Sequence, residues 1–167
     1  MIVEDGLHVF ERVFGFRAKH FNPCGNHGIS ETLTPSLQAG GIQYIDTERF
    51  KREHLGNGKF GSKVFNYTGK KNHFGQMYFV RNCVFEPTEK RGVDWVNFCL
   101  DQIQAAFRWN QPANISSHRV NYCGHIDPQN RKEGLIALRG LLKEIVRRWP
   151  DVEFMSSDEL GDLMSKS

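Results

Sequence analysis

The sequence lacks the features that mark membrane, fibrous or disordered proteins. Its 167 residues contain no apolar run near the ~20 residues that a membrane-spanning helix needs, and the mean hydropathy is −0.52. There is no collagen-like glycine repeat, and 39% of the residues are hydrophobic. Length and composition therefore predict one globular domain over residues 1–167 that does not cross a membrane.

A strong excess of charge is also missing. The chain has 22 basic and 19 acidic side chains, a formal net charge of +3 and a pI of 8.7. Nucleic-acid-binding domains typically have a pI above about 9. The basic residues are scattered, apart from a thin cluster between Lys59 and Lys71. We therefore expect no nucleic-acid partner.

Paired cysteine and histidine motifs are absent as well. No C-x-x-C pair occurs, and no two histidines are three or four residues apart, which argues against a zinc ribbon or a helix with two histidine ligands. No metal ligand is therefore assigned. The first 21 residues include Glu4 and Asp5 and no apolar core segment, so they do not resemble a secretory signal. The expected compartment is the cytoplasm, with reduced thiols.

Short apolar runs alternate with helical patterns along the chain. Apolar residues spaced three and four apart predict a helix that begins at the N-terminus. Further helices are expected over 30–40, 94–109, 132–149 and 158–165, and strands near 18–21 and over 42–45, 77–85, 113–118 and 152–155. Residues 46–76 look like a long polar insertion. The alternation predicts an α/β fold with a parallel sheet, either open and doubly wound or part of a barrel.

Polar residues that follow the predicted strands are the candidate site, because the carboxyl ends of parallel strands line the sites of such folds. Three segments qualify: Asn22–Gly28, Arg81–Asn82 with Glu86 just beyond, and Ser116–Asn121. His118 follows a strand, so it is either a general acid or substrate-binding group, or a core histidine bonded to a backbone carbonyl.

Two arginines and one cysteine complete the candidates from the residues alone. Arg81 and Arg119 each carry a planar fork that suits a carboxylate of substrate or of the protein itself. Cys24 lies beside a glycine in a loop, but no spacing assigns it a catalytic partner.

Two of the strand-end segments resemble motifs of polysaccharide deacetylases. FRAKHFNP, residues 16–23, resembles the arginine–proline motif found midway along that family, and ISSH, residues 115–118, resembles its late strand ending in histidine. Longer runs over 72–87, 106–131 and 149–160 are similar to the C-terminal half of bacterial proteins described as polysaccharide (de)acetylases.

The resemblance implies the C-terminal half of a distorted (β/α) barrel in which a divalent metal such as zinc activates water to remove acetyl groups from a glycan. Arg17, with Lys19 as the alternative, would orient the catalytic carboxylate, although the proline is displaced to Pro23. His118 would protonate the leaving group or support the oxyanion. Arg119 and Asn121, together with Arg81 and Asn82, are the expected substrate-binding residues.

The early Asp-Asp and His-x3-5-His motifs that supply the family's base and metal ligands do not occur here. The cofactor expected for the full-length family therefore has no ligands assigned in this chain. We expect a fragment that is inactive as a deacetylase on its own and whose partner is a carbohydrate.

Two alternatives remain open. The first is a non-catalytic carbohydrate-binding or scaffold domain, in which aromatic residues of the insertion stack on sugar rings. The aromatic residues concerned are Phe60, Phe65, Tyr67 and Phe74. The second is a glycoside hydrolase of related barrel architecture, for which Glu86 and Glu53 are available carboxylates.

Overall fold

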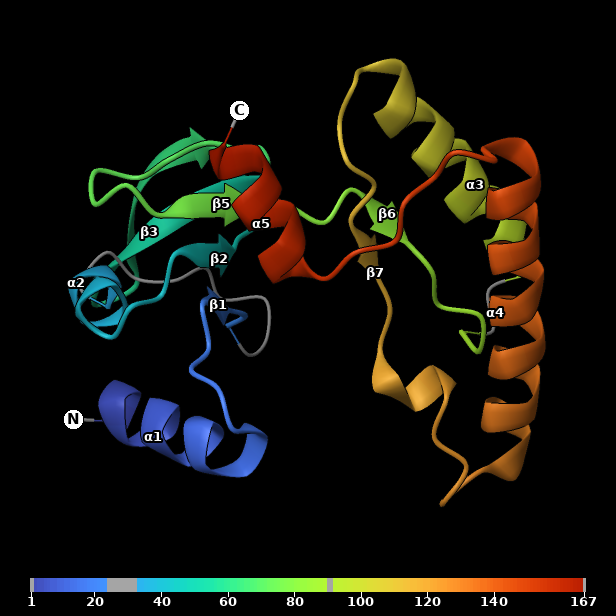
Figure 1. The fold of residues 1–167 in the computed structure, drawn as a ribbon, viewed down its shortest axis with the longest axis horizontal. Helices are drawn as coiled ribbons and strands as arrows, with labels where there is room; N and C mark the ends of the chain where they lie inside the picture. The colour runs from blue at the N-terminus through green and yellow to red at the C-terminus, as the bar shows by residue number, and fades with distance from the viewer. Residues whose placement is uncertain (1, 24–32, 90–91, 167) are drawn as a thin grey trace. The chain divides into compact units, whose positions relative to one another are not determined.

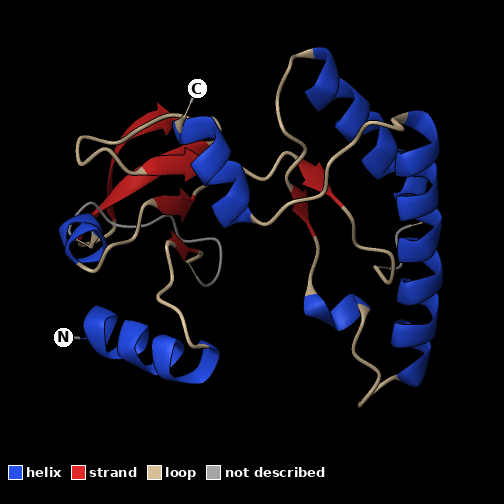
Figure 2. Ribbon diagram, viewed as in Figure 1, coloured by secondary structure: helices blue, strands red, loops and turns tan. Residues whose placement is uncertain are grey.

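The computed structural model describes residues 2–23, 33–89 and 92–166 (Figure 1). The chain forms two compact units, and we describe each by itself. Unit 1 contains the residues up to Val80 and the C-terminal segment from Met155, and unit 2 contains residues 81–154. Both units combine helices with parallel strands (Figure 2), which confirms the mixed α/β class. No described helix has both the length and the apolar character needed to cross a bilayer.

The centre of unit 1 is a parallel sheet in the order β1-β2-β5. Its strands are β1 (His20–Phe21), β2 (Tyr44–Asp46) and β5 (Met77–Phe79). The pairs His20↔Tyr44 and Tyr44↔Met77 fix the register. This sheet is the parallel arrangement that the alternating pattern predicts.

Two helices precede or connect these strands. α1 (Ile2–Phe14) follows the predicted apolar spacing and buries Leu7. α2 (Thr34–Ala39) has a proline in its first turn and ends at Gly40, although the start predicted at Ser30 lies outside the described residues. Leu7 packs in one buried cluster with Leu37 and the strand residue Ile45.

The last helix, α5 (Ser157–Ser165), returns to this sheet and packs against β2. The sequence predicts this helix over 158–165, with Ser157 as its cap. The N-cap in the structure is Ser156, because the Ser156 side chain and Glu159 form a reciprocal capping box. The helix packs closely on β2 at Gly161, where a Cβ would lie 2.5 Å from the Tyr44 ring.

A polar cluster also joins α5 to the sheet. Asp162 accepts hydrogen bonds from the Tyr44 hydroxyl at 2.6 Å and the Lys19 ammonium at 3.1 Å. These two bonds lower the pKa of Asp162. Burial and the bond to Asp162 raise the pKa of Tyr44. The anionic form of Asp162 therefore stabilises the position of α5.

The predicted polar insertion contains a β-hairpin. β3 (Phe50–Gly56) and β4 (Lys59–Phe65) pair antiparallel, with the turn at Asn57–Gly58 in the left-handed region. Asn-Gly is a strong signal for a two-residue hairpin turn. The hairpin therefore had a local signal in the sequence, although residues 46–76 as a whole show little periodicity.

Unit 2 is built on the parallel pair β6 (Cys83–Val84) and β7 (Ile115–Ser116). α3 (Trp95–Arg108) has Asp94 as its N-cap, where the sequence predicts the helix to begin. α4 (Pro128–Arg148) has Asp127 as its N-cap and begins before the predicted residue 132. The two helices pack together (Figure 1) and share a core with β6. The fully buried residues of this core include Cys83, Phe85, Cys99, Leu100, Ile103 and Leu141.

Two predicted strands differ from the structure. The single strand expected over 77–85 is divided into β5 and β6, which belong to different units. Residues 152–155 form no strand, because Val152 packs into the helical core of unit 2 rather than along a neighbouring strand. Short apolar runs indicate burial more directly than they indicate strand pairing.

Candidate functional site

The register of β6 and β7 brings Glu86 and His118 together. Cys83 pairs with Ile115 and Val84 with Ser116, an offset of 32 residues. The same offset places Glu86 opposite His118, two residues beyond the carboxyl ends of the strands. Neighbouring positions of parallel strands carry their side chains side by side. The topology alone therefore juxtaposes these two groups.

The Glu86–His118 pair is a short hydrogen-bonded contact at the surface of unit 2. His118 Nδ1 lies 2.7 Å from Glu86 Oε1. The Glu86 side chain is 12% exposed, whereas that of His118 is 74% exposed. The carboxylate is therefore held in the protein while most of the imidazole faces solvent. His118 is not the backbone-bonded core histidine that the sequence left as an alternative.

Asn121 fixes the second oxygen of Glu86. Its Nδ2 donates to Glu86 Oε2 at 2.7 Å and to the His118 carbonyl at 2.8 Å. Its Oδ1 accepts from the backbone N–H and the hydroxyl of Thr88. Donors and acceptors on both ends of the amide are satisfied, so the network defines the orientation of the Asn121 side chain. Asn121 is only 1% exposed.

The carboxylate of Glu86 is surrounded by donors. It accepts from the Asn121 amide, from the His118 ring and, at 3.4 Å, from the His118 backbone N–H. An ionised carboxylate accepts hydrogen bonds on both oxygens. In the neutral imidazole, Nδ1 accordingly carries the proton and Nε2 keeps its lone pair.

A short 3₁₀ helix, η1 (Arg119–Asn121), carries Asn121, and α4 lies directly against it. Gly134 of α4 is the contact point, because a Cβ there would collide with the Asn121 carbonyl oxygen. The hydroxyls of Ser117 and Tyr122 are 2.8 Å apart and join the two ends of the turn. Packing and hydrogen bonds thus hold the turn from both sides.

The other predicted residues of unit 2 take different positions. Arg81 donates to the Ser116 hydroxyl at 3.2 Å beside the parallel strands. Asn82 bonds the Pro112 carbonyl and the Asn114 backbone N–H, so its side chain holds the segment before β7 against β6. Arg119 is exposed on η1, next to His118.

Arg17 belongs to unit 1, where it joins α1 to the end of α2. It donates to Glu4 at 2.7 Å and to the Gly40 carbonyl at 3.2 Å, and it lies 3.6 Å from Glu11. The bond to Glu4 raises the pKa of Arg17 and lowers that of Glu4. Within unit 1, the Arg17 side chain therefore links α1 to the end of α2.

The sequence reasoning missed a second histidine–carboxylate pair, which joins the first residue of β1 to the last residue of β2 in unit 1. His20 Nε2 lies 3.0 Å from Asp46 Oδ1, and both side chains are less than one fifth exposed. The His20 ring also packs edge-on against Phe79. A signal was available, since His20 lies in the strand predicted near 18–21 and Asp46 follows the strand predicted over 42–45. Cys24, by contrast, lies outside the described residues.

Within residues 2–23, 33–89 and 92–166, no group of three or more His, Cys, Asp or Glu side chains is placed to hold a metal ion. Each histidine–carboxylate pair offers two such groups. By themselves the described residues do not fit the divalent-metal site that the deacetylase resemblance implies.

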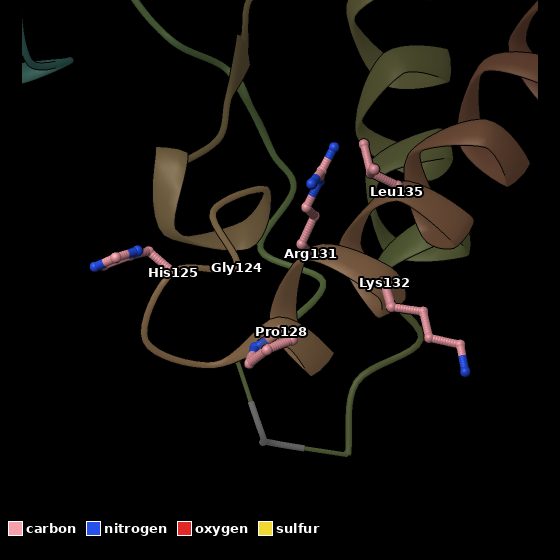
Figure 3. Close-up of a pocket in the computed structure, with 6 residues that line it drawn as sticks. All are labelled: Gly124, His125, Pro128, Arg131, Lys132 and Leu135. Carbon is pink, nitrogen blue, oxygen red and sulfur yellow. The ribbon is translucent and has the colours of Figure 1, made fainter.

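An open pocket of about 550 Å³ lies at the beginning of α4. It is lined by Gly124, His125, Pro128, Arg131, Lys132 and Leu135. In Figure 3 the three basic side chains point in different directions, with His125 and Lys132 extending to opposite sides of Arg131. They do not converge on one point as the ligands of a single anion would.

Comparison with models of known families gives no match for this chain, and no curated protein or solved structure matches it. The fold and the site geometry are therefore the basis of any functional assignment, together with the motif resemblance. Among the candidates from the sequence, the structure joins His118, Asn121 and Glu86, and Glu86 connects the other two.

Proposed function

We propose that Glu86 and His118 act as a general acid–base pair in the hydrolysis of acetyl groups from a glycan, as part of a carbohydrate deacetylase-type hydrolase. The observation that carries this proposal is the 2.7 Å contact between Glu86 Oε1 and Nδ1 of a largely exposed imidazole. Carboxylate–imidazole pairs of this kind orient the ring and stabilise its protonated form during catalysis.

The pair supplies both proton transfers of acetyl hydrolysis. His118 Nε2 takes a proton from water as the water oxygen bonds to the acetyl carbon. The imidazolium then gives that proton to the sugar oxygen or nitrogen as its bond to the acetyl carbon breaks. Acetate and the free sugar hydroxyl or amine are the products. Glu86 stays ionised and balances the imidazolium charge between the two steps.

Two features support a glycan as the substrate class. The segments 16–23 and 115–118 resemble deacetylase motifs, and His118 ends the second of them. The parallel strands with helical crossovers suit half of a distorted (β/α) barrel, and we include that architecture in the proposal. A divalent metal would supply an activated water in that family. Arg17 and the exposed Arg119 are the further candidates on this chain.

Hydrolysis of 4-nitrophenyl acetate by the full chain tests the acid–base role, because this activated ester can be cleaved without the metal site that the chain is expected to lack for glycan deacetylation. We expect His118→Ala to lower the protein-catalysed rate by about 10²-fold, and Glu86→Gln to lower it less. His125→Ala is the matched control, because His125 is also exposed in unit 2. Equal rates for wild type and His118→Ala would contradict the proposal.

Binding of acetylated oligosaccharides tests the glycan assignment separately. The ring resonances of His118 are followed by NMR during titration with acetylated chito- and xylo-oligosaccharides. We expect the His118 signals to shift while those of His125 remain in place. If no acetylated glycan moves the His118 signals, the substrate class is wrong even where the aryl ester is cleaved.

A further inference from the structure

The hairpin of unit 1 carries three neighbouring aromatic rings on its surface. Phe50 and Phe65 are directly opposite in the β3–β4 register, with ring centroids 5.4 Å apart. Tyr67 continues the row, 6.2 Å from Phe65. Each side chain is about half exposed, at 50%, 53% and 53%. We call these three residues the aromatic face. Phe74, which the sequence also suggested, instead packs on His73.

Two cations lie on the same side of the hairpin as the aromatic face. Arg52 pairs with Lys63, one step of two residues from the Phe50–Phe65 pair, so the four side chains share one side of the ribbon. Both cations are exposed, and the Lys63 ammonium lies 4.1 Å from the centre of the Phe50 ring. In the described part of the chain, no acidic side chain forms a salt bridge with Arg52 or Lys63.

The pairing of Arg52 with Lys63 places two positive charges directly opposite each other in the hairpin. Directly opposite like charges destabilise an antiparallel pair, and three half-exposed rings beside them add apolar surface in contact with water. An anionic ligand with flat apolar faces would relieve both the charge repulsion and the exposure of apolar surface. It neutralises Arg52 and Lys63, and it covers the aromatic face.

We propose that the aromatic face, with Arg52 and Lys63, binds an acidic polysaccharide, a chain of pyranose rings that bear carboxylates. The C–H faces of the sugar rings pack on Phe65 and Tyr67. A carboxylate on the sugar pairs with the guanidinium of Arg52 and the ammonium of Lys63. This inference does not rest on the proposed hydrolase function, because the surface belongs to unit 1 and requires no catalysis.

A single-stranded nucleic acid is the competing ligand, since bases also stack on aromatic rings beside cations. The charge of the whole chain favours the glycan. A net charge of +3 and a pI of 8.7 fall short of the basic footprint of nucleic-acid-binding domains, whose pI exceeds about 9. Two cations beside three rings suit spaced carboxylates better than a continuous phosphate backbone.

Calorimetric titration of the full chain with oligogalacturonate tests the proposal, with a neutral xylo-oligosaccharide and a single-stranded DNA oligomer as the other ligands. We expect oligogalacturonate to bind most tightly. Phe65→Ala and Lys63→Glu should each raise its Kd by about five- to tenfold or more. Phe65→Tyr should bind as wild type does, since it keeps the ring.

Two control variants test whether a loss of binding is specific to the aromatic face and its two cations, or follows from any truncation on the hairpin or any loss of positive charge. Val64→Ala truncates an exposed residue on the opposite side of the same strand. Lys143→Glu makes the same charge change at an exposed position of α4 in unit 2. Both should leave the Kd unchanged. The proposal is overturned by absence of oligogalacturonate binding, by equal losses in Lys63→Glu and Lys143→Glu, or by tighter binding of DNA that Phe65→Ala abolishes.

Discussion

Gly134 and Asn121 meet backbone to backbone, so closely that a methyl group on Gly134 would collide with the Asn121 carbonyl oxygen. Gly134 is buried in the second turn of α4, while Asn121 ends η1 and bonds Glu86. α4 and η1 can approach this closely because glycine at position 134 has no side chain. The orientation of the Glu86–His118 pair therefore depends on a residue that touches neither of them.

Gly134→Ala tests this dependence. We expect it to destabilise the chain by roughly 1–3 kcal/mol, because either η1 or α4 must move. Gly140→Ala, on the same helix, has its nearest neighbour 4.0 Å from the added Cβ. It should stabilise the helix by about 0.5–1 kcal/mol. Urea unfolding of both variants measures the two effects, and a shift of the same sign for both would show that the contact is not tight.

The contact between α5 and the sheet allows a similar comparison. Gly161→Ala places a Cβ 2.5 Å from the Tyr44 ring, so α5 should move away and its backbone amides should exchange faster with deuterium. Gly6→Ala, in α1, meets nothing within 4 Å and should leave α5 exchange unchanged. Protection of α5 that survives Gly161→Ala would mean that the Tyr44 ring moves and that the helix does not.

Acid should weaken the polar cluster on α5. The bonds from Tyr44 and Lys19 lower the folded-state pKa of Asp162 below its ordinary value of 3.8. Its stabilisation is therefore complete above that value and is lost as the pH falls below it. Asp162→Asn should unfold at lower urea concentration than wild type at pH 7, and the difference should shrink as the pH is lowered below 3.8.

An acidic residue outside this cluster provides the control for acid. Asp151 is exposed in unit 2, and Asp151→Asn should match wild type at pH 7 and at pH 3. If Asp162→Asn and wild type differ equally at pH 7 and pH 3, the anionic charge of Asp162 does not hold α5.

The cysteines should differ sharply in reactivity. Burial raises the pKa of Cys83 to about 12 and that of Cys99 to about 11, whereas Cys123 is exposed. The thiolate is the reactive form, so iodoacetamide at pH 8 should modify Cys123 and leave Cys83 and Cys99 intact until the chain is unfolded. Peptide mass spectrometry gives the labelling order. Labelling of Cys83 as fast as Cys123 would show that the core of unit 2 opens readily.

Local signals in the sequence predicted the helices well. The apolar spacing located α1, and Asp94 located the start of α3. For α4 the sequence left Asn130 and Asp127 as alternative caps, and the structure uses Asp127. The division of 77–85 between two units was not predictable in this way. Its residues are apolar except for Arg81 and Asn82. Strand pairing depends on partners far along the chain, such as Tyr44 for β5 and Ile115 for β6.

The site was predicted in part, for the same reason. His118 was found because it follows a strand, and Asn121 because it lies in the same segment. Their link through Glu86 depends on which strand pairs with β7 and in which register, and neither is visible in one segment alone. Arg17 was singled out by a motif resemblance, and its contacts with Glu4 and the Gly40 carbonyl within unit 1 were not visible in the sequence.

The equal offset that pairs β6 with β7 and Glu86 with His118 also limits how this protein can change length. The stretch between the two strands can gain or lose residues in its loops without altering the pair. One residue inserted or deleted at Phe85 or Ser117 would turn one partner to the other face and separate the two groups. Within residues 83–118, the spacing must therefore stay fixed only from β6 to Glu86 and from β7 to His118.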